Sequence, residues 1–294
     1  MFYINVAFPV SFNTALGRCR LIIFDDSTHD IKILEETIIS YSQLVNKKYG
    51  DITPTPYTIH ITKDIQAFYK QANGPVPEWG IAITKKNPNR IIMQSPSVAR
   101  ISFNRLIQVL IHELNHVYLN NVLNSRSFPS WFKEGMAMHE SKEFSINHSV
   151  LISLARWNKT LFSIDELKNF NQINKNTSRL AYAESFAMFS SLNYYYGDNI
   201  YKNIITAMNQ GDIFWEALTH VTADSKDDIK NNINSFLNKK YNWMFLLNSY
   251  NLIFLLLPLI LIVGYLYKMY KNKKLLRKWE IEELLEDLHN NEAN

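Results

Sequence analysis

From Arg20 to about Pro96, strand-like and helix-like patterns of apolar and polar residues follow one another along the chain. A spacing of two is typical of strands, and spacings of three and four are typical of helices. Strands are predicted at residues 20–26, 56–62, 79–84 and 90–95, and helices at residues 30–49 and 63–72. Residues 18–100 are therefore expected to form a small α+β unit around a mixed sheet.

After Ser97 the strand signals stop and helical spacings recur instead. The predicted helices span residues 102–120, 130–143, 145–157, 179–196, 198–209 and 225–240. Short polar breaks separate these helices. Residues 101–240 are therefore expected to form a mostly helical subdomain after the sheet.

The last fifty residues differ in composition from the rest. Residues 252–267 are sixteen residues without a charge, and the flanking residues 243–251 bring the stretch to the roughly 20 residues that cross a bilayer. Aromatic residues lie near both ends, where interfacial aromatics are common. Residues 243–267 are thus predicted to be one transmembrane helix in a lipid bilayer, with a buried core helix as the alternative.

The charge around this helix predicts an orientation. Six basic residues follow it at once: Lys268, Lys271, Lys273, Lys274, Arg277 and Lys278. The positive-inside rule then places residues 268–294, a basic-then-acidic amphipathic tail, in the cytoplasm. A single-pass membrane protein with its main domain outside the cytoplasm is expected. Residues 1–17 are either a degenerate export signal for that domain or a first strand.

Charge and cysteine content exclude some functions. The net charge of +4 is modest and its excess is local, so no nucleic-acid-binding face is predicted. Cys19 is the only cysteine in the sequence. An intrachain disulfide and a Cys-rich zinc finger are therefore excluded.

The segment QVLIHELNHVYLN, residues 108–120, places two histidines four positions apart in a helical pattern. Residues four apart share a face of a helix, so His112 and His116 can occupy adjacent corners of a zinc tetrahedron. Glu113 points close to the same side, where it can take a proton from water on the metal. The alternative is a core helix whose three polar groups have hydrogen-bond partners.

A catalytic zinc needs a third protein ligand and an open position for water. Glu134, in the segment PSWFKEGMAMHE, lies eighteen residues beyond His116, which allows a turn and a second helix returning past the first. Gly135 and Ala137 are small enough to let helices approach closely. Glu134 is the predicted third ligand, with an exposed helix glutamate as the alternative reading of that position.

The HELNH motif followed by WFKEGMA resembles the gluzincin metallopeptidases, specifically the peptidase MA-like families and the related aminopeptidases. The resemblance covers about residues 20–240 and implies a small sheet before a zinc-binding helix and a glutamate-bearing helix. It extends to AYAESFAMFSSLNYYYG, residues 181–197, where related enzymes carry a tyrosine that stabilises an oxyanion. It therefore implies Tyr182 as the electrophilic partner, with the tyrosines at 194–196 as rivals.

One departure from the aminopeptidases concerns substrate specificity. Their Gly-x-Met-Glu-Asn loop, which holds a free amine, is missing from residues 75–95. Endopeptidase-like specificity is therefore favoured, and the strand at 90–95 is predicted to offer an edge to an extended peptide. His139 and Glu140 are candidates to orient a metal ligand or else surface residues, and His148 is predicted to be structural or exposed.

These observations predict a membrane-anchored zinc metallopeptidase that hydrolyses peptide bonds of a peptide or protein substrate. His112, His116 and Glu134 would hold one Zn²⁺ per chain, Glu113 would be the general base, and Tyr182 would stabilise the oxyanion. The alternative is a catalytically inactive gluzincin-like scaffold that acts as a membrane-tethered sensor or binding module. No pattern in the sequence indicates an oligomeric state.

Overall fold

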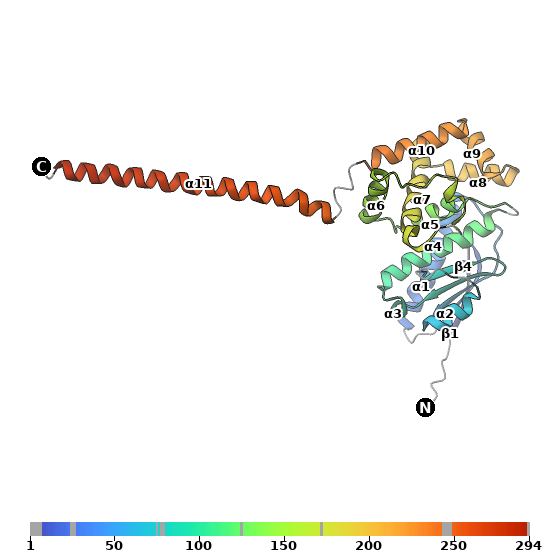
Figure 1. Cartoon of the computed structure of the whole chain (residues 1–294). Helices are drawn as coiled ribbons and strands as arrows, with labels where there is room; N and C mark the ends of the chain where they lie inside the picture. The colour runs from blue at the N-terminus through green and yellow to red at the C-terminus, as the bar shows by residue number, and fades with distance from the viewer. Residues whose placement is uncertain are drawn as a thin grey trace, which may run out of the picture. The chain divides into compact units, whose positions relative to one another are not determined.

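A computed structural model describes residues 8–23, 28–74, 76, 80–123, 126–170, 173–242 and 249–292 (Figure 1). The chain divides into two compact units, Met1–Asn242 and Trp243–Asn294. Each unit is described by itself below.

The first unit contains a five-stranded mixed sheet in the order β1-β2-β3-β5-β4. Its strands are β1 (Phe8–Thr14), β2 (Gly17–Ile23), β3 (Tyr57–Thr62), β4 (Ala82–Lys85) and β5 (Asn89–Gln94). The three central strands are parallel, since β3 pairs with β2 on one side and with β5 on the other. The two edge strands are antiparallel, since β1 pairs with β2 and β4 pairs with β5. The part of residues 1–17 that lies within the described chain thus contains a first strand, and residues 1–7 lie outside it.

The sheet order corrects the prediction about the substrate edge. Residues 90–95 correspond to β5, which pairs with β3 on one side and β4 on the other. β5 is therefore an interior strand and has no free edge. The edge beside it belongs to β4, which pairs only with β5 among the described residues.

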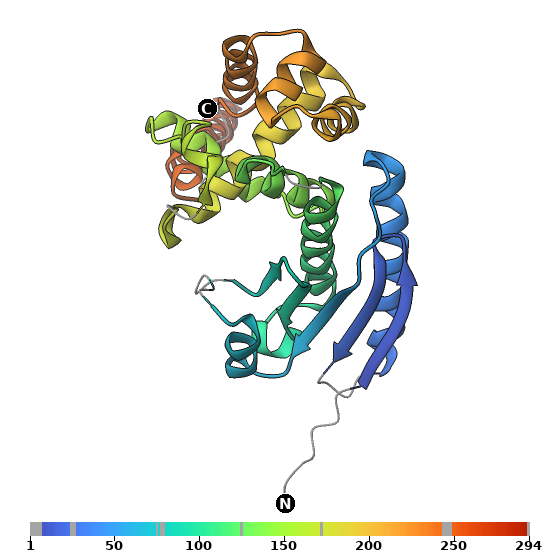
Figure 2. The ribbon, with the colours of Figure 1, turned by 90° about the vertical axis from the view of Figure 1, so that its right-hand side faces the viewer.

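Two sets of helices cover the sheet. Side chains alternate along β2, with Cys19 and Leu21 fully buried and Arg20 exposed between them, so the strand buries one face. α1 (Thr28–Tyr49) and α4 (Phe103–Val122) contact each other and the strands from one side (Figure 2). α2 (Ile65–Ala72) packs Phe68 against Ile92 of β5 in a second small core.

The remaining helices of this unit follow the sheet in sequence. They are α3 (Pro96–Ala99), α5 (Ser130–Glu140), α6 (Ile146–Trp157), α7 (Lys175–Tyr196), α8 (Ile200–Gln210), α9 (Phe214–Thr222) and α10 (Lys226–Lys240), with a 3-10 turn, η1, at Glu166–Lys168. The sequence did not predict α9, although Phe214, Ala217 and Leu218 are buried at helical spacing. The mixed sheet followed by helices agrees with the expected α+β class.

α5 and α7 pack at very short range. A Cβ atom added at Gly135 would collide with the backbone carbonyl of Ser185 and with the side chain of Phe189. Gly135 and the fully buried Ala137 therefore let α5 lie directly on α7. This contact fixes the neighbouring Glu134 relative to both helices.

The second unit corrects the membrane prediction. It contains α11 (Ser249–Glu292), one helix that runs on from the apolar stretch into the charged tail. No helix in the described chain is both long and apolar enough to cross a membrane. Residues 243–248 lie outside the described chain. The predicted transmembrane helix at 243–267 and the single-pass localisation, with an outer catalytic domain and a cytoplasmic tail, are therefore wrong.

Candidate active site

α4 carries the two histidines on its less buried face. Its first turn is capped by Ser102, whose side chain accepts a hydrogen bond from the backbone N–H of Arg105. Leu110 and Leu114 are fully buried on the opposite face. His112 and His116 therefore turn away from the core, and their ring centroids lie 4.9 Å apart.

α5 brings Glu134 to these two rings. Its Oε2 atom lies 3.3 Å from Nε2 of His112 and 3.5 Å from Nε2 of His116. The three potential ligand atoms all lie within 4.8 Å of one another, and they form the one such group of ligand-type residues in the described part of the chain.

This donor set fits zinc. Two ligand atoms bound to a tetrahedral zinc at about 2.0–2.1 Å lie roughly 3.3–3.4 Å apart. The two distances from Glu134 are close to that value, and two imidazoles with one carboxylate are ligands that zinc commonly takes. Three protein ligands leave a fourth position open for water or substrate, as in catalytic sites.

Glu143 orients the first histidine. Its Oε2 atom lies 2.8 Å from Nδ1 of His112, while its Oε1 atom lies 3.0 Å from the guanidinium of Arg105. A carboxylate at Nδ1 favours the tautomer with its proton there, which leaves the Nε2 lone pair for a metal. The side chain of Glu143 is mostly buried, so this contact is shielded from water.

The charges around His112 favour a cation at this place. Burial lowers the pKa of His112, but Glu143 and Glu134 outweigh burial and leave it well above its ordinary value. Burial raises the pKa of Glu134, but His116 and His112 hold it well below its usual range. A divalent metal ion would supply the same compensation for the two buried carboxylates.

Glu113 is held beside the ligands by the edge strand. The hydroxyl of Thr84 in β4 donates a hydrogen bond of 2.6 Å to Oε2 of Glu113 and also lies 3.2 Å from its backbone carbonyl. Glu113 is largely buried, so this partner restricts its carboxylate strongly. The strand and the helix together therefore hold this carboxylate beside the three ligand-type residues, at the position predicted for a general base.

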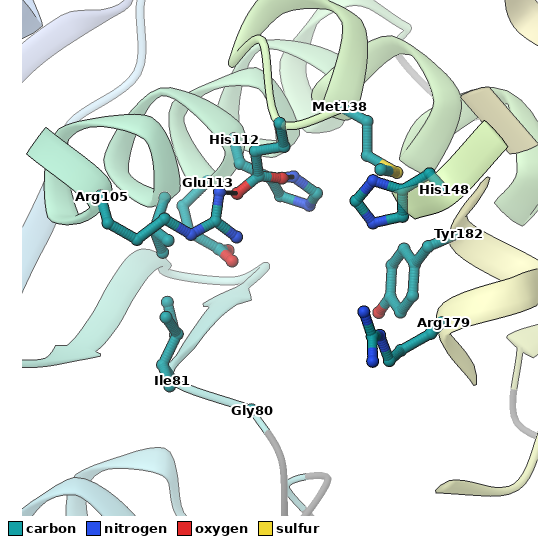
Figure 3. A pocket seen from close by; sticks show the side chains of 12 residues that line it. Gly80, Ile81, Arg105, His112, Glu113, Met138, His148, Arg179 and Tyr182 are labelled. Carbon is teal, nitrogen blue, oxygen red and sulfur yellow. Dashed lines mark hydrogen bonds and ion pairs between the residues drawn. The ribbon is translucent and has the colours of Figure 1, made fainter. Parts of the chain in front are cut away.

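A cavity of about 400 Å³ opens in front of these groups (Figure 3). α4 lines it with His112 and Glu113, residues 80–82 line it before and within β4, and α7 lines it with Arg179 and Tyr182. Figure 3 shows the Tyr182 ring and the Arg179 side chain across the cavity from Glu113. The site thus lies between the sheet and the helical part of the unit.

The chemical state of Tyr182 suits a hydrogen-bond donor. Glu134, burial and the further carboxylates of Glu113 and Glu143 raise its pKa well above the ordinary value. The phenol therefore keeps its proton at neutral pH and can donate it to an oxygen that gains negative charge.

The two candidates expected to orient a ligand lie elsewhere. Glu140 accepts hydrogen bonds from Lys48 and Tyr49 and contacts His139, and its side chain is only 4% exposed. It is therefore neither a surface residue nor a partner of the metal ligands. Glu143 takes the orienting position instead, just after α5 ends.

Sequence reasoning missed four residues around the cavity. Thr84 and Glu143 bond Glu113 and His112, while Arg179 and His148 line the cavity. His148, expected to be structural or exposed, both caps α6 and faces the cavity. A signal existed for Arg179 alone, because it lies three residues before Tyr182 on one helix.

Comparison with known families agrees with this geometry. Residues 42–239, about two thirds of the chain, match the family described as the Peptidase MA superfamily. The chain belongs to this superfamily. The predicted relationship to the peptidase MA-like gluzincins is therefore confirmed, and the match includes the α4 and α5 segments that carry the candidate ligands.

Comparison with solved structures gives distant similarities for this peptidase MA chain. A variant of an M1 zinc metallopeptidase from Deinococcus radiodurans is 10% identical, with a TM-score of 0.46, and the alignment covers 80% of this chain and 52% of that one. An aminopeptidase N family protein from Idiomarina loihiensis is 13% identical, with a TM-score of 0.41, over 82% of this chain and 43% of that one. The chain thus spans about half the length of these proteins or less. No curated protein matches the sequence.

Proposed function

We propose that this protein is a zinc-dependent metallopeptidase that hydrolyses internal peptide bonds. The observation that carries the proposal is the cluster of His112, His116 and Glu134 with Glu113 beside it. His112 and Glu113 also line the cavity. A purely structural zinc site has no use for a general base and normally has four protein ligands. Membership of the Peptidase MA superfamily supports the same class of reaction.

The proposed chemistry divides between the two sides of the cavity. Zinc bound by the three ligands would polarise a peptide carbonyl and make a water molecule more acidic. Glu113 takes a proton from the attacking water and returns it to the leaving amine. Tyr182 donates a hydrogen bond to the carbonyl oxygen as negative charge develops there. Thr84 and Glu143 keep Glu113 and His112 in their reactive orientations.

The edge strand supports binding of an extended peptide. β4 leaves one edge unpaired among the described residues, and Gly80, Ile81 and Ala82 line the cavity. A peptide added there as a further strand would satisfy its backbone groups and pass in front of Glu113. This replaces the earlier assignment of the substrate edge to residues 90–95.

The charges in the cavity support endopeptidase over aminopeptidase action. Its carboxylates among the described lining residues are Glu113 and Glu143, and both already have partners. An aminopeptidase needs a carboxylate to hold the substrate's free amine. Arg105, Arg179 and His148 line the same cavity and would not attract an ammonium group.

The first test is zinc content and peptide hydrolysis by the full chain, with Glu113→Gln as the matched variant. The wild type should hold about one zinc per chain and cleave quenched-fluorescent peptides. Removing zinc with a chelator should abolish cleavage, and added zinc should restore it. Glu113→Gln should retain zinc but lose roughly 10²–10⁴-fold in kcat, because it keeps the shape and loses the base.

Two results would contradict the proposal. A folded wild-type protein that takes up no zinc would remove the metal site. A zinc-loaded protein that cleaves no peptide, and whose Glu113→Gln variant behaves identically, would favour the inactive scaffold.

A further inference from the structure

We propose that Arg179 forms a carboxylate-binding subsite in the catalytic cavity and selects substrates that carry a carboxylate near the scissile bond. This inference rests on the proposed peptidase function and names the substrate class of that site. It depends on the position of Arg179, on the absence of an ion-pair partner for it among the described residues, and on the kind of group that a guanidinium binds.

Arg179 is placed to meet substrate. It lies one helical turn before Tyr182 on α7, so both side chains leave the same side of the helix. Both line the cavity, and Figure 3 shows the guanidinium beside the Tyr182 ring, across from Glu113. A peptide whose carbonyl contacts Tyr182 therefore brings its neighbouring groups to Arg179.

The other arginine of the cavity is already neutralised. Arg105 lies 3.0 Å from Glu143 and donates a further hydrogen bond to Gln108. Arg179 has no ion pair within the described residues, and its side chain is exposed at the cavity. Its positive charge is therefore available to a ligand.

His148, which also lines the cavity, neither neutralises the charge of Arg179 nor adds a second positive charge. Its Nδ1 atom accepts a hydrogen bond from the backbone N–H of Ser145, which places the proton of a neutral ring on Nε2. Burial, followed by the charge of Arg179, lowers the pKa of His148. The ring is thus a neutral neighbour, and Arg179 carries the local charge.

A carboxylate is the peptide group that best fits this position. The planar guanidinium presents donors in a fork that matches the two oxygens of a carboxylate. In a peptide substrate the carboxylate comes either from an aspartate or glutamate side chain or from a free C-terminus. If Arg179 contacted only water, peptides with and without a carboxylate would bind equally well.

The test measures peptide binding to the zinc-loaded Glu113→Gln protein, which holds substrate without cleaving it. The probes are variants of one fluorescein-labelled neutral peptide. The reference has an amidated C-terminus, a scanning set replaces one glutamine at a time with glutamate, and a third form has a free C-terminus. Each is measured again with Arg179→Gln added, and with Arg18→Gln added as a control that removes an exposed arginine from β2.

The expected result is tighter binding of one carboxylate-bearing form, by about tenfold or more over the reference. Arg179→Gln should abolish that preference while leaving zinc content unchanged, and Arg18→Gln should preserve it. A preference within the scanning set identifies an acidic side chain as the source. A preference for the free C-terminus identifies that group and would contradict the proposed cleavage of internal bonds, because the cleaved bond would then lie near the chain end.

Equal binding of all forms, or a preference that survives Arg179→Gln in a folded protein, would overturn the subsite. Cleavage of peptides by the wild type without any carboxylate preference would leave the proposed peptidase function intact and remove only this inference. An Arg179-dependent preference in a protein that cleaves no peptide would support the carboxylate subsite and contradict the proposed peptidase function.

Discussion

The two helices that flank the cavity hold their functional side chains in different ways. On α4, His112 is fixed by Glu143 and Glu134, and Glu113 is fixed by Thr84. On α7, Tyr182 packs its ring against Phe170, but its hydroxyl has no hydrogen bond within the described residues. Preorganised groups suit metal binding and proton transfer, whereas free donors suit contacts made only when substrate arrives.

Of the substitutions that test this difference between the two helices, the one at Tyr182 on α7 is expected to have the largest effect on kcat. Tyr182→Phe removes the hydroxyl that would stabilise the oxyanion and keeps the ring in contact with Phe170. We expect kcat to fall by about 10²–10³-fold, with little change in KM or zinc content, because the lost contact forms in the transition state. Steady-state kinetics on a cleaved peptide measure this.

The matched control is Tyr194→Phe, on the same helix, where the side chain is 68% exposed. Wild-type kinetics are expected for this variant. If Tyr182→Phe also retained wild-type kcat, Tyr182 would have no part in the reaction and the α7 side would serve binding alone.

The sequence predicted the position of a site residue best where that residue lies close in the chain to the others. His112, Glu113 and His116 share one helix, so their spacing alone defined their relative positions. Glu134 required only that a second helix return past the first. Tyr182 came from a family resemblance, since many tyrosines compete in the sequence.

The residues that were missed depend on tertiary contacts. Thr84 reaches Glu113 from the edge strand across twenty-nine positions, and Glu143 reaches His112 across thirty-one. No local period encodes such pairings. The sheet order likewise could not be derived from strand patterns, so β5 was taken for an edge. The membrane prediction failed for another reason, since it rested on composition alone, and no helix in the described chain is both long and apolar enough to cross a membrane.

A smaller effect is expected on the α4 side when its orienting carboxylate is neutralised. Glu143→Gln keeps a hydrogen-bonding group near Nδ1 of His112 but removes the charge that fixes the tautomer. We expect zinc affinity to fall by about 10–100-fold, measured by competition with a chelator of known affinity. Activity at saturating zinc should recover most of its wild-type value.

Glu140→Gln serves as the control for that experiment. Glu140 lies on the glutamate-bearing helix but bonds Lys48 and Tyr49, away from the ligands. Its loss can reduce stability, but zinc affinity of the folded protein should not change. An equal loss of affinity in both variants would show that the effect is general and that Glu143 has no specific orienting role.

The smallest effect is expected at the contact between the edge strand and Glu113, the proposed general base. Thr84→Val keeps the branched shape favoured in strands and removes the hydroxyl that donates to Glu113. A single hydrogen bond contributes about 0.5–1.5 kcal/mol, so kcat should fall by about 2- to 10-fold with zinc content unchanged. Thr84→Ser, which retains the hydroxyl, should restore most of the rate. Equal kinetics for Val, Ser and wild type would mean that burial alone holds Glu113, and the α4 side would then depend on fewer fixed contacts than its geometry indicates.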